Sequence, residues 1–573
     1  MLILKKVITK VKKMKSNKEI LIYNLNNKKN NNVILKYFIH FLLITFIFIF
    51  IFYSYILIKP LDEINNLTSG ASSKIYGIIL ISILTIIMFI LYLLKKLNFK
   101  RLVILLLLTG LVLKLVYMLY TPANVRQYDT FSTNHNGHFD YTLYIFENFK
   151  LPHKVFTEND VYQFYHPPIN YFTQAIFMHV FKFIHPVNYF IKDNESLFQT
   201  CQILSCFYCF LISLYGVKTI CLTKLSNSSK MIGIIFVIFF PRLNQFSGQL
   251  NNDPLAALFT VLSLYRISKW YLNGKHTLDF LLTSLYLGLG MATKLSSSIV
   301  TLGLAFVFLI ELIKSIKKKE NSLKLSKLLL QYILFLIIVI PLGLSFQVYS
   351  HKVYGLPYNF VFRNLNSALF TGYRGYIENR QDIYRLSYYD EQNSGLIYTN
   401  HLYNILVRYI SPISFNDFLL AGYPYCNAFE NYNIVSYAIR SALFGEFGYW
   451  NGVSFASISV VLAYLLLYFS LTILVYCLIK DKKIIDKNFI LAISITISII
   501  VFFIYLQISM PFGCSMDFRY IVPIIIPFSY ILCYINESLI NRKNKLTYSL
   551  SLILKLLTYS FIFIISTFYF VAI

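Results

Sequence analysis

The polar residues of this chain that could take part in chemistry are concentrated in a few short segments. The first segment, "RQYDTFSTNHNGHFDY" (126–141), contains Asp129 and, shortly after it, His135, His138 and Asp140. A carboxylate such as Asp129 can act as a general base or bind a divalent metal ion, and nearby histidines can serve as further metal ligands. The spacing is not a specific metal signature, so a solvated aspartate and ordinary loop hydrogen bonding are the alternatives.

Two further segments place a polar residue directly before proline. In "YHPPINY" (165–171), Pro167 and Pro168 predict the start of a helix, where their missing N–H groups are harmless. His166 can donate a hydrogen bond to a phosphate or orient the loop, or it can be incidental to the helix start. Asp253 in "QLNNDPLAAL" can support a site or help bind a metal ion, but it also fits a plain helix N-cap.

Two basic residues are suited to an anionic ligand. Lys294 in "ATKLSS" can bind a lipid phosphate as a point charge, or its side chain can simply extend to the membrane interface. Arg519 in "MDFRYIVPIIIP" can bind a phosphate through two parallel hydrogen bonds, or it can pair with the nearby Asp517. Glu446 in "FGEFGYW" is an additional supporting candidate.

The composition predicts that membrane-spanning helices position these residues. The chain has 57% hydrophobic and 13% charged residues and a mean hydropathy of +0.60, with many apolar runs long enough to cross a bilayer. In a soluble protein the net charge of +27 would suggest nucleic acid, but here Lys and Arg lie mainly in short loops between apolar runs. The eight cysteines lie mostly in or beside apolar runs and form no metal-ligand pattern, so we interpret them as packing residues. The expected fold is an all-α polytopic bundle.

The basic loops predict which side of the membrane each segment occupies. The basic tail 1–33 should be cytoplasmic, because positively charged loops stay inside. If Ile169–Ile184 crossed the membrane, the basic segment 223–230 would lie outside, so we expect this apolar stretch to lie along the outer interface instead. That choice gives about 13 spans. They are 34–57, 75–94, 102–120, 198–219, 231–247, 255–273, 278–293, 296–314, 327–348 and four more after residue 452.

The same topology divides the chain into five parts and collects the candidate residues on one side. After the tail come a transmembrane hairpin (34–101), a core (102–348), a Tyr-rich outer segment (349–452) and C-terminal transmembrane helices (453–573). The core has two outer loops, 121–197 and 242–254. All the polar candidates named above then fall at the outer face. Ionisable residues near membrane depth are costly, which favours a functional role for them.

The order of these motifs resembles that of the GT-C superfamily of membrane glycosyltransferases. The most similar members are bacterial relatives of protein O-mannosyltransferases and of lipid A aminoarabinose transferase. The resemblance extends from about Leu102 to Pro527 and is most specific where the HPP motif is followed by the LNNDP motif. Its motifs are Asp129, "GHFDYTLYIFENFKLP", "YHPPINY", "LNNDPLAAL", "ATKLSS" and "FRYIVPIIIP".

The resemblance implies transfer of a sugar from a polyprenyl-phosphate donor to a lipid, glycan or protein acceptor at the outer face of the plasma membrane. By motif position, Asp129 is the catalytic aspartate, Asp253 the second outer-loop aspartate, and Lys294 the lysine near the donor phosphate. The family often follows its aspartate with Glu, but Thr130 stands here, so Asp140 or His138 is expected to supply the second catalytic group. A divalent metal ion is an optional cofactor in the superfamily.

Two other classes of membrane protein are alternatives. A polysaccharide polymerase or ligase would share this geometry but use a diphosphate-linked donor. A lipid or sugar transporter would perform no chemistry, and its ionisable residues would be expected near the membrane midplane, often in broken helices and repeats. The gathering of candidates at one face favours a transferase.

Overall fold

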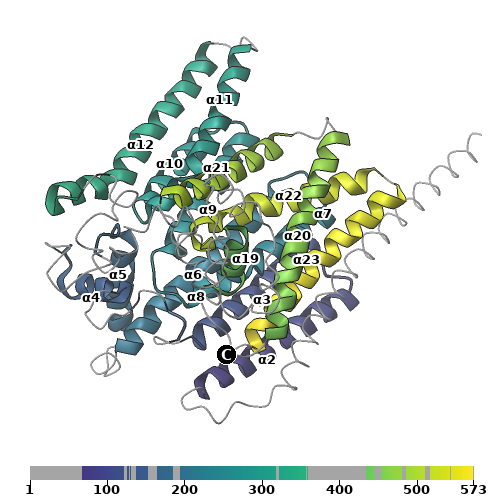
Figure 1. Ribbon diagram of the computed structural model, residues 1–573, viewed down its shortest axis with the longest axis horizontal. Coiled ribbons are helices and arrows are strands. Elements are labelled where there is room, and N and C mark those ends of the chain that lie inside the picture. The colour runs from purple at the N-terminus through teal and green to yellow at the C-terminus, as the bar shows by residue number, and fades with distance from the viewer. Residues whose placement is uncertain are drawn as a thin grey trace, which may run out of the picture.

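A computed structural model confirms the predicted all-helical class. It describes residues 68–121, 125–127, 130, 137–152, 164–184, 194–317, 322–356, 358, 434–445, 453–480, 486–509, 517–542 and 544–571. All regular secondary structure within these ranges is helical. Helices are the natural choice for these apolar runs, because a helix satisfies its own backbone hydrogen bonds in lipid. Most of the helices form one bundle, and α4 and α5 lie together at its side (Figure 1).

The helices differ widely in length, and short 3-10 helices (η) precede two of them. In chain order they are α2 (Thr68–Leu93), α3 (Phe99–Leu119), α4 (His138–Asn148), α5 (Ile169–Ile184), α6 (Asn194–Cys221), α7 (Asn227–Ile238), α8 (Pro241–Gly248), α9 (Asp253–Leu272), α10 (Thr277–Met291), η1 (Leu295–Val300), α11 (Thr301–Lys317), α12 (Ser322–Tyr354), α19 (Ile434–Phe444), α20 (Val453–Lys480), α21 (Lys487–Ser509), η6 (Phe518–Ile524), α22 (Ile525–Asn541) and α23 (Lys545–Val571).

Ten segments of the described residues are long and apolar enough to cross a membrane, and all ten were expected as spans. Of the other three expected spans, 34–57 lies outside the described residues. The remaining two are α9, which carries Asp253, Arg266 and Lys269, and α10, which has only 15 residues. Because α9 and α10 are consecutive and pack against each other, counting both or neither as spans leaves the sidedness of every later helix unchanged.

Helix α5 has the length expected of a helix that does not cross the membrane. Its 16 residues extend only about 24 Å, which is less than the hydrocarbon core of a bilayer. It packs against α4 and α6, and it is not among the segments long enough to span. Its position along the outer interface stays a prediction.

Residues 242–247 belonged both to the expected span 231–247 and to the expected outer loop 242–254, and the structure contradicts the loop for residues 242–248. Residues Pro241–Gly248 form α8, and every residue of this helix is buried. Pro241 interrupts the α7–α8 run because proline has no backbone N–H to donate. Lys114 Nζ donates to the Ile238 carbonyl at the end of α7, at 2.9 Å, and so satisfies an acceptor that the interrupted helix leaves open. The chain therefore reaches its outer turn only at residues 249–252.

The helix ends that were predicted to lie outside meet at one end of the bundle. Gln202 on α6 donates through Nε2 to the carbonyls of Thr121 and Gly248, at 2.6 and 2.7 Å. The Tyr354 hydroxyl at the end of α12 donates to the Pro152 carbonyl, at 2.7 Å. These contacts join segments far apart in sequence at the ends of these helices.

The ends that were predicted to lie in the cytoplasm contact one another in a separate set of polar pairs. Arg266 pairs with Asp279 at 2.9 Å, which joins the end of α9 to the start of α10. Lys275 pairs with Glu311 at 2.9 Å, which adds α11 to the same region. The helix ends that the charge-based topology assigned to one side of the membrane thus contact one another. The membrane side of each end stays a prediction.

A labelling experiment in intact cells tests that topology. With Cys426 and Cys514 replaced by serine, Lys352→Cys at the end of α12 should react with a membrane-impermeant maleimide. Lys545→Cys at the start of α23 should react only after the cells are permeabilised. Both lysines are exposed at helix ends, so they form a matched pair. Labelling of Lys545→Cys, but not of Lys352→Cys, in intact cells would contradict the topology.

Candidate functional site

The centre of the candidate site is an ion pair between Lys294 and Asp253. Lys294 Nζ lies 2.5 Å from Asp253 Oδ1, and the two side chains are only 14% and 4% exposed. Asp253 is the first residue of α9, and Lys294 immediately precedes η1 at the turn after α10. Asn252, not Asp253, occupies the N-cap position of α9. The carboxylate of Asp253 is therefore engaged in a buried ion pair rather than in the plain helix cap that the sequence also allowed.

Arg519 reaches the same region from the other end of the chain. The ring of Tyr520 has its centroid 4.9 Å from Lys294 Nζ and 5.1 Å from the guanidinium carbon of Arg519. Both distances fall in the range of cation–π contacts. One tyrosine ring therefore contacts both of the cations that the sequence singled out.

Asp517 accepts the backbone N–H of Arg519 at 2.7 Å, and its carboxylate forms an ion pair with Arg242. The sequence allowed Arg519 to pair with Asp517. The contact that the structure shows between them involves the backbone N–H of Arg519. The ion-pair partner of Asp517 is Arg242, a residue that the expected topology placed in an outer loop.

His138 and His166 form a stacked pair beside these charges. The centroids of the two rings lie 5.3 Å apart, and the angle between the ring planes is 21°. His138 is the first residue of α4, and its Nδ1 lies 2.6 Å from the hydroxyl of Tyr171 on α5. The packing of α4 against α5 and the two prolines before α5 therefore fix both imidazoles.

Burial and neighbouring cations keep both histidines neutral. Burial lowers the pKa of His138 well below its usual value, and the charges of Lys294 and Arg519 lower it further. Burial also lowers the pKa of His166 well below its usual value, and His138 and Lys294 add to the shift. We refer to His138, His166, Asp253, Lys294 and Arg519 as the site cluster.

The ion pair keeps Asp253 charged despite its burial. Burial alone would raise the pKa of the Asp253 carboxyl, but the positive charges of Lys294 and Arg519 outweigh burial and lower the pKa. A hydrogen bond from Asn170 Nδ2 to the Asn251 carbonyl, at 3.2 Å, joins the start of α5 to the turn before Asp253. The histidine pair and the ion pair are thus held by one set of contacts.

Asp140 has a local structural role. Its Oδ2 accepts the backbone N–H of Gly137 at 2.7 Å, which caps the first turn of α4. Thr130, the neighbour of Asp129 in sequence, is buried, and its carbonyl accepts the N–H of Phe139 at 3.0 Å. The segment before α4 is therefore tied to the residue that follows His138.

Three of the predicted residues, Asp129, His135 and Glu446, lie outside the described residues. Within the part of the chain that the structure describes, no group of three or more His, Cys, Asp or Glu residues could hold a metal ion. The proposed metal ligand Asp253 is paired with Lys294 instead. Whether Asp129 contributes to a metal site stays a prediction.

Three residues near the site cluster were not singled out from the sequence: Tyr171, Tyr520 and Arg242. The tyrosines lie in the quoted motifs "YHPPINY" and "FRYIVPIIIP", but nothing distinguishes them there from the many other tyrosines of the chain. Arg242 offered a clearer signal. It lies inside the expected span 231–247, and an arginine at that depth predicts a buried partner.

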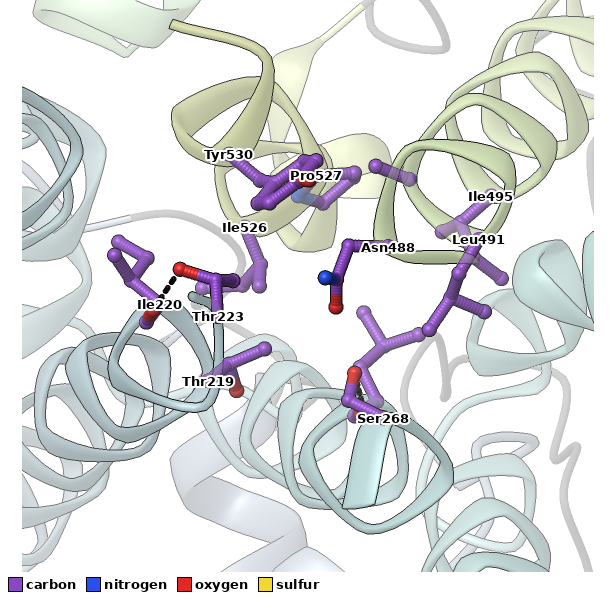
Figure 2. A pocket seen from close by; sticks show the side chains of 12 residues that line it. Thr219, Ile220, Thr223, Ser268, Asn488, Leu491, Ile495, Ile526, Pro527 and Tyr530 are labelled. Carbon is purple, nitrogen blue, oxygen red and sulfur yellow. Dashed lines mark hydrogen bonds between the residues drawn. The ribbon is translucent and has the colours of Figure 1, made fainter. Parts of the chain in front are cut away.

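A separate pocket lies among α6, α9, α21 and α22. Its lining is partly apolar and includes Thr219, Ser268, Asn488 and Tyr530 (Figure 2). The hydroxyl of Tyr530 donates to Asp486, at the end of the bundle predicted to be cytoplasmic. The pocket contains no member of the site cluster, so it plays no part in the site described above.

Comparison with known proteins gives one family match. Residues 161–353 match the family of dolichyl-phosphate-mannose-protein mannosyltransferases. The matched range covers about a third of the chain, and it agrees with the resemblance that the sequence motifs carry. Three members of the site cluster, His166, Asp253 and Lys294, lie inside the matched range, whereas His138 and Arg519 lie outside it.

The chain also has distant structural likenesses. Archaeal oligosaccharyltransferase AglB from Archaeoglobus fulgidus, in complex with an inhibitory peptide and a dolichol-phosphate, aligns with 82% of this chain at 12% identity and a TM-score of 0.43. The alignment covers 56% of AglB, so this chain spans about half of that protein's length. ArnT from Cupriavidus metallidurans bound to undecaprenyl phosphate aligns over 76% of this chain and 77% of its own, at 11% identity and a TM-score of 0.32. These scores support no inference about activity. No curated protein matches the sequence.

The neutral histidines predict a pH dependence of stability. Because the pKa of each is lowered in the folded state, the unfolded chain binds protons first as the pH falls below about 6.5. The free energy of unfolding should therefore decrease between about pH 7 and pH 5. Thermal unfolding of purified protein should show this decrease, and it should be smaller in His138→Asn and His166→Asn.

His276→Asn, at the opposite end of the bundle, controls for the loss of a histidine as such and should keep the wild-type slope. A slope that is equal in all four proteins would show that the buried pair does not cause the pH dependence.

Proposed function

We propose that this enzyme transfers one sugar from a polyprenyl-phosphate donor to an acceptor at the outer face of the membrane. The observation that supports this proposal most strongly is the meeting of two cations, Lys294 and Arg519, at a single tyrosine ring. The ring centroid of Tyr520 lies 4.9 Å from Lys294 Nζ and 5.1 Å from the Arg519 guanidinium carbon. A pair of largely buried cations at helix ends is suited to a phosphate monoester or diester.

In the proposed reaction, an acceptor oxygen attacks the anomeric carbon as the bond from that carbon to the phosphate oxygen breaks. The polyprenyl phosphate leaves with the bonding electron pair, and Lys294 and Arg519 stabilise its growing negative charge. Asp129 accepts or orients the proton of the acceptor hydroxyl. Asp253 holds Lys294 near the phosphate position, because its carboxylate lies only 2.5 Å from Lys294 Nζ.

The histidine pair completes the proposed site. His166 positions the donor, and as a neutral imidazole it can donate one hydrogen bond to a phosphate oxygen. Of the two residues considered as the second catalytic group, the contacts favour His138 over Asp140. Asp140 already accepts the Gly137 N–H as a helix cap, whereas His138 is stacked against His166 beside the two cations.

The same arrangement argues against a transporter. The described members of the site cluster lie at or near helix ends, not in the middle of spans, where transporters usually bind their substrates. A ligase that uses a diphosphate-linked donor would require room for a second phosphate near Lys294. For the acceptor we propose only a class: a lipid, glycan or protein reached from the outer face.

Donor selection tests the proposal directly. Purified enzyme should transfer labelled sugar from a polyprenyl-phosphate donor but not from the matching diphosphate donor. Lys294→Gln and Arg519→Gln should each lower kcat by about 100-fold, because each removes one charge from the leaving phosphate. Lys352→Gln, at the exposed end of α12, is the control and should keep wild-type activity.

Use of only the diphosphate donor would replace this proposal with the ligase. No turnover with either donor would favour transport.

A second test compares two aspartates of the same segment. Asp129→Asn should reduce transfer by about 100-fold or more, because it removes the proposed general base. Asp140→Asn should lower thermal stability by about 1 kcal/mol through loss of the α4 cap, with little change in rate. Full transfer by Asp129→Asn in membranes would show that its assigned role is wrong.

A further inference from the structure

A second buried ion pair lies next to the site cluster and plays no part in the proposed chemistry. Arg242 Nη2 on α8 donates to both carboxylate oxygens of Asp517, at 2.9 and 3.0 Å. Both side chains are completely buried. Such a pair is costly to desolvate, and it is stable only when its geometry is good and its remaining hydrogen-bonding groups find partners.

Partners for Arg242 Nη1 come from α8 and α19, whereas Arg242 Nε is buried without a hydrogen-bond partner. Arg242 Nη1 donates to Gln245 Oε1 at 2.7 Å and to the Ser441 carbonyl at 3.0 Å. Gln245 Nε2 in turn donates to the Leu443 carbonyl at 2.6 Å. One arginine therefore fixes helix α19 against α8 and, through the carboxylate, against Asp517.

The same groups fix the first two backbone amides of η6. The N–H of Phe518 donates to Ser441 Oγ at 2.9 Å, and the N–H of Arg519 donates to Asp517 Oδ1 at 2.7 Å. The first N–H groups of a helix have no partner within the helix, so these two contacts determine how η6 begins. Arg242 contacts both of the residues that supply these acceptors, because it binds the Asp517 carboxylate and the Ser441 carbonyl.

The start of η6 carries Tyr520, which contacts Lys294, and Arg519, which contacts the same tyrosine ring. Arg519 and Tyr520 are its second and third residues, and the Tyr520 ring contacts both cations. A change in the first turn of η6 would therefore move the guanidinium of Arg519 relative to Lys294. Displacements of about 1 Å in a catalytic group can lower rates by about 100-fold.

We infer that Arg242 is a positioning residue for the transfer reaction, acting through Asp517 and Ser441 to set the placement of Arg519 beside Lys294. The inference rests on the proposed function, in which Arg519 binds the leaving phosphate. It also gives a role to α19, which lies within the Tyr-rich segment 349–452 and supplies Ser441.

A double-variant experiment separates positioning from general stability. Asp517→Asn removes the charge that Arg242 binds, and it should lower kcat/KM for the polyprenyl-phosphate donor by about 10- to 100-fold. Because this loss acts through Arg519, the double variant Asp517→Asn/Arg519→Gln should be no more than about twofold slower than Arg519→Gln alone. Ser441→Ala keeps the ion pair and removes only the acceptor of the Phe518 N–H, so it should show a smaller loss in the same direction.

Asp279→Asn is the matched control. Asp279 is also a buried, ion-paired aspartate, but its partner Arg266 lies at the opposite end of the bundle. This variant should lower thermal stability and leave kcat/KM within about twofold of wild type. If Asp517→Asn fails to fold, Ser441→Ala and its combination with Arg519→Gln serve as the test.

Two results would overturn the inference. In one, the fold loss of kcat/KM in the double variant equals the product of the losses in the two single variants, Asp517→Asn or Ser441→Ala on the one hand and Arg519→Gln on the other. In the other, Asp279→Asn lowers kcat/KM as much as Asp517→Asn. Wild-type enzyme that transfers no sugar from the polyprenyl-phosphate donor would instead overturn the proposed function, and the inference with it. Active wild type with multiplicative losses would overturn the inference alone.

Discussion

The buried contact between Lys294 and Asp253 constrains the rest of the site. Neither charge is stable in such a place alone, so the start of α9 and the turn after α10 must stay together for both to remain ionised. The Tyr520 ring and the two neutral histidines then lie around a pair whose position is already determined.

The site cluster is assembled from helix ends that are far apart in sequence. His138 and His166 come from the α4–α5 unit at the side of the bundle (Figure 1), whereas Arg519 belongs to η6 near the carboxyl end of the chain. The mannosyltransferase family match covers the central part, with His166, Asp253 and Lys294. Contacts between side chains therefore join the family segment to His138 before it and to Arg519 after it.

The sequence predicted the spans well because hydropathy is a local property: all ten candidate spans were expected. It also pointed to five residues that the structure brings together. It failed where the outcome depends on contacts between distant residues. Residues 242–247 were assigned both to a span and to an outer loop, and they form a buried helix whose Arg242 pairs with Asp517, 275 residues away. Asp140 looked catalytic by type, and only the contact with Gly137 shows that it caps α4.

The most direct test of the proposed phosphate site is an experimental structure of the enzyme with bound polyprenyl phosphate. We expect the phosphate oxygens within about 3.2 Å of both Lys294 Nζ and the Arg519 guanidinium, with His166 at the edge of the phosphate site. A phosphate bound elsewhere, with Lys294 contacting only Asp253 and Tyr520, would contradict the proposed role of the two cations.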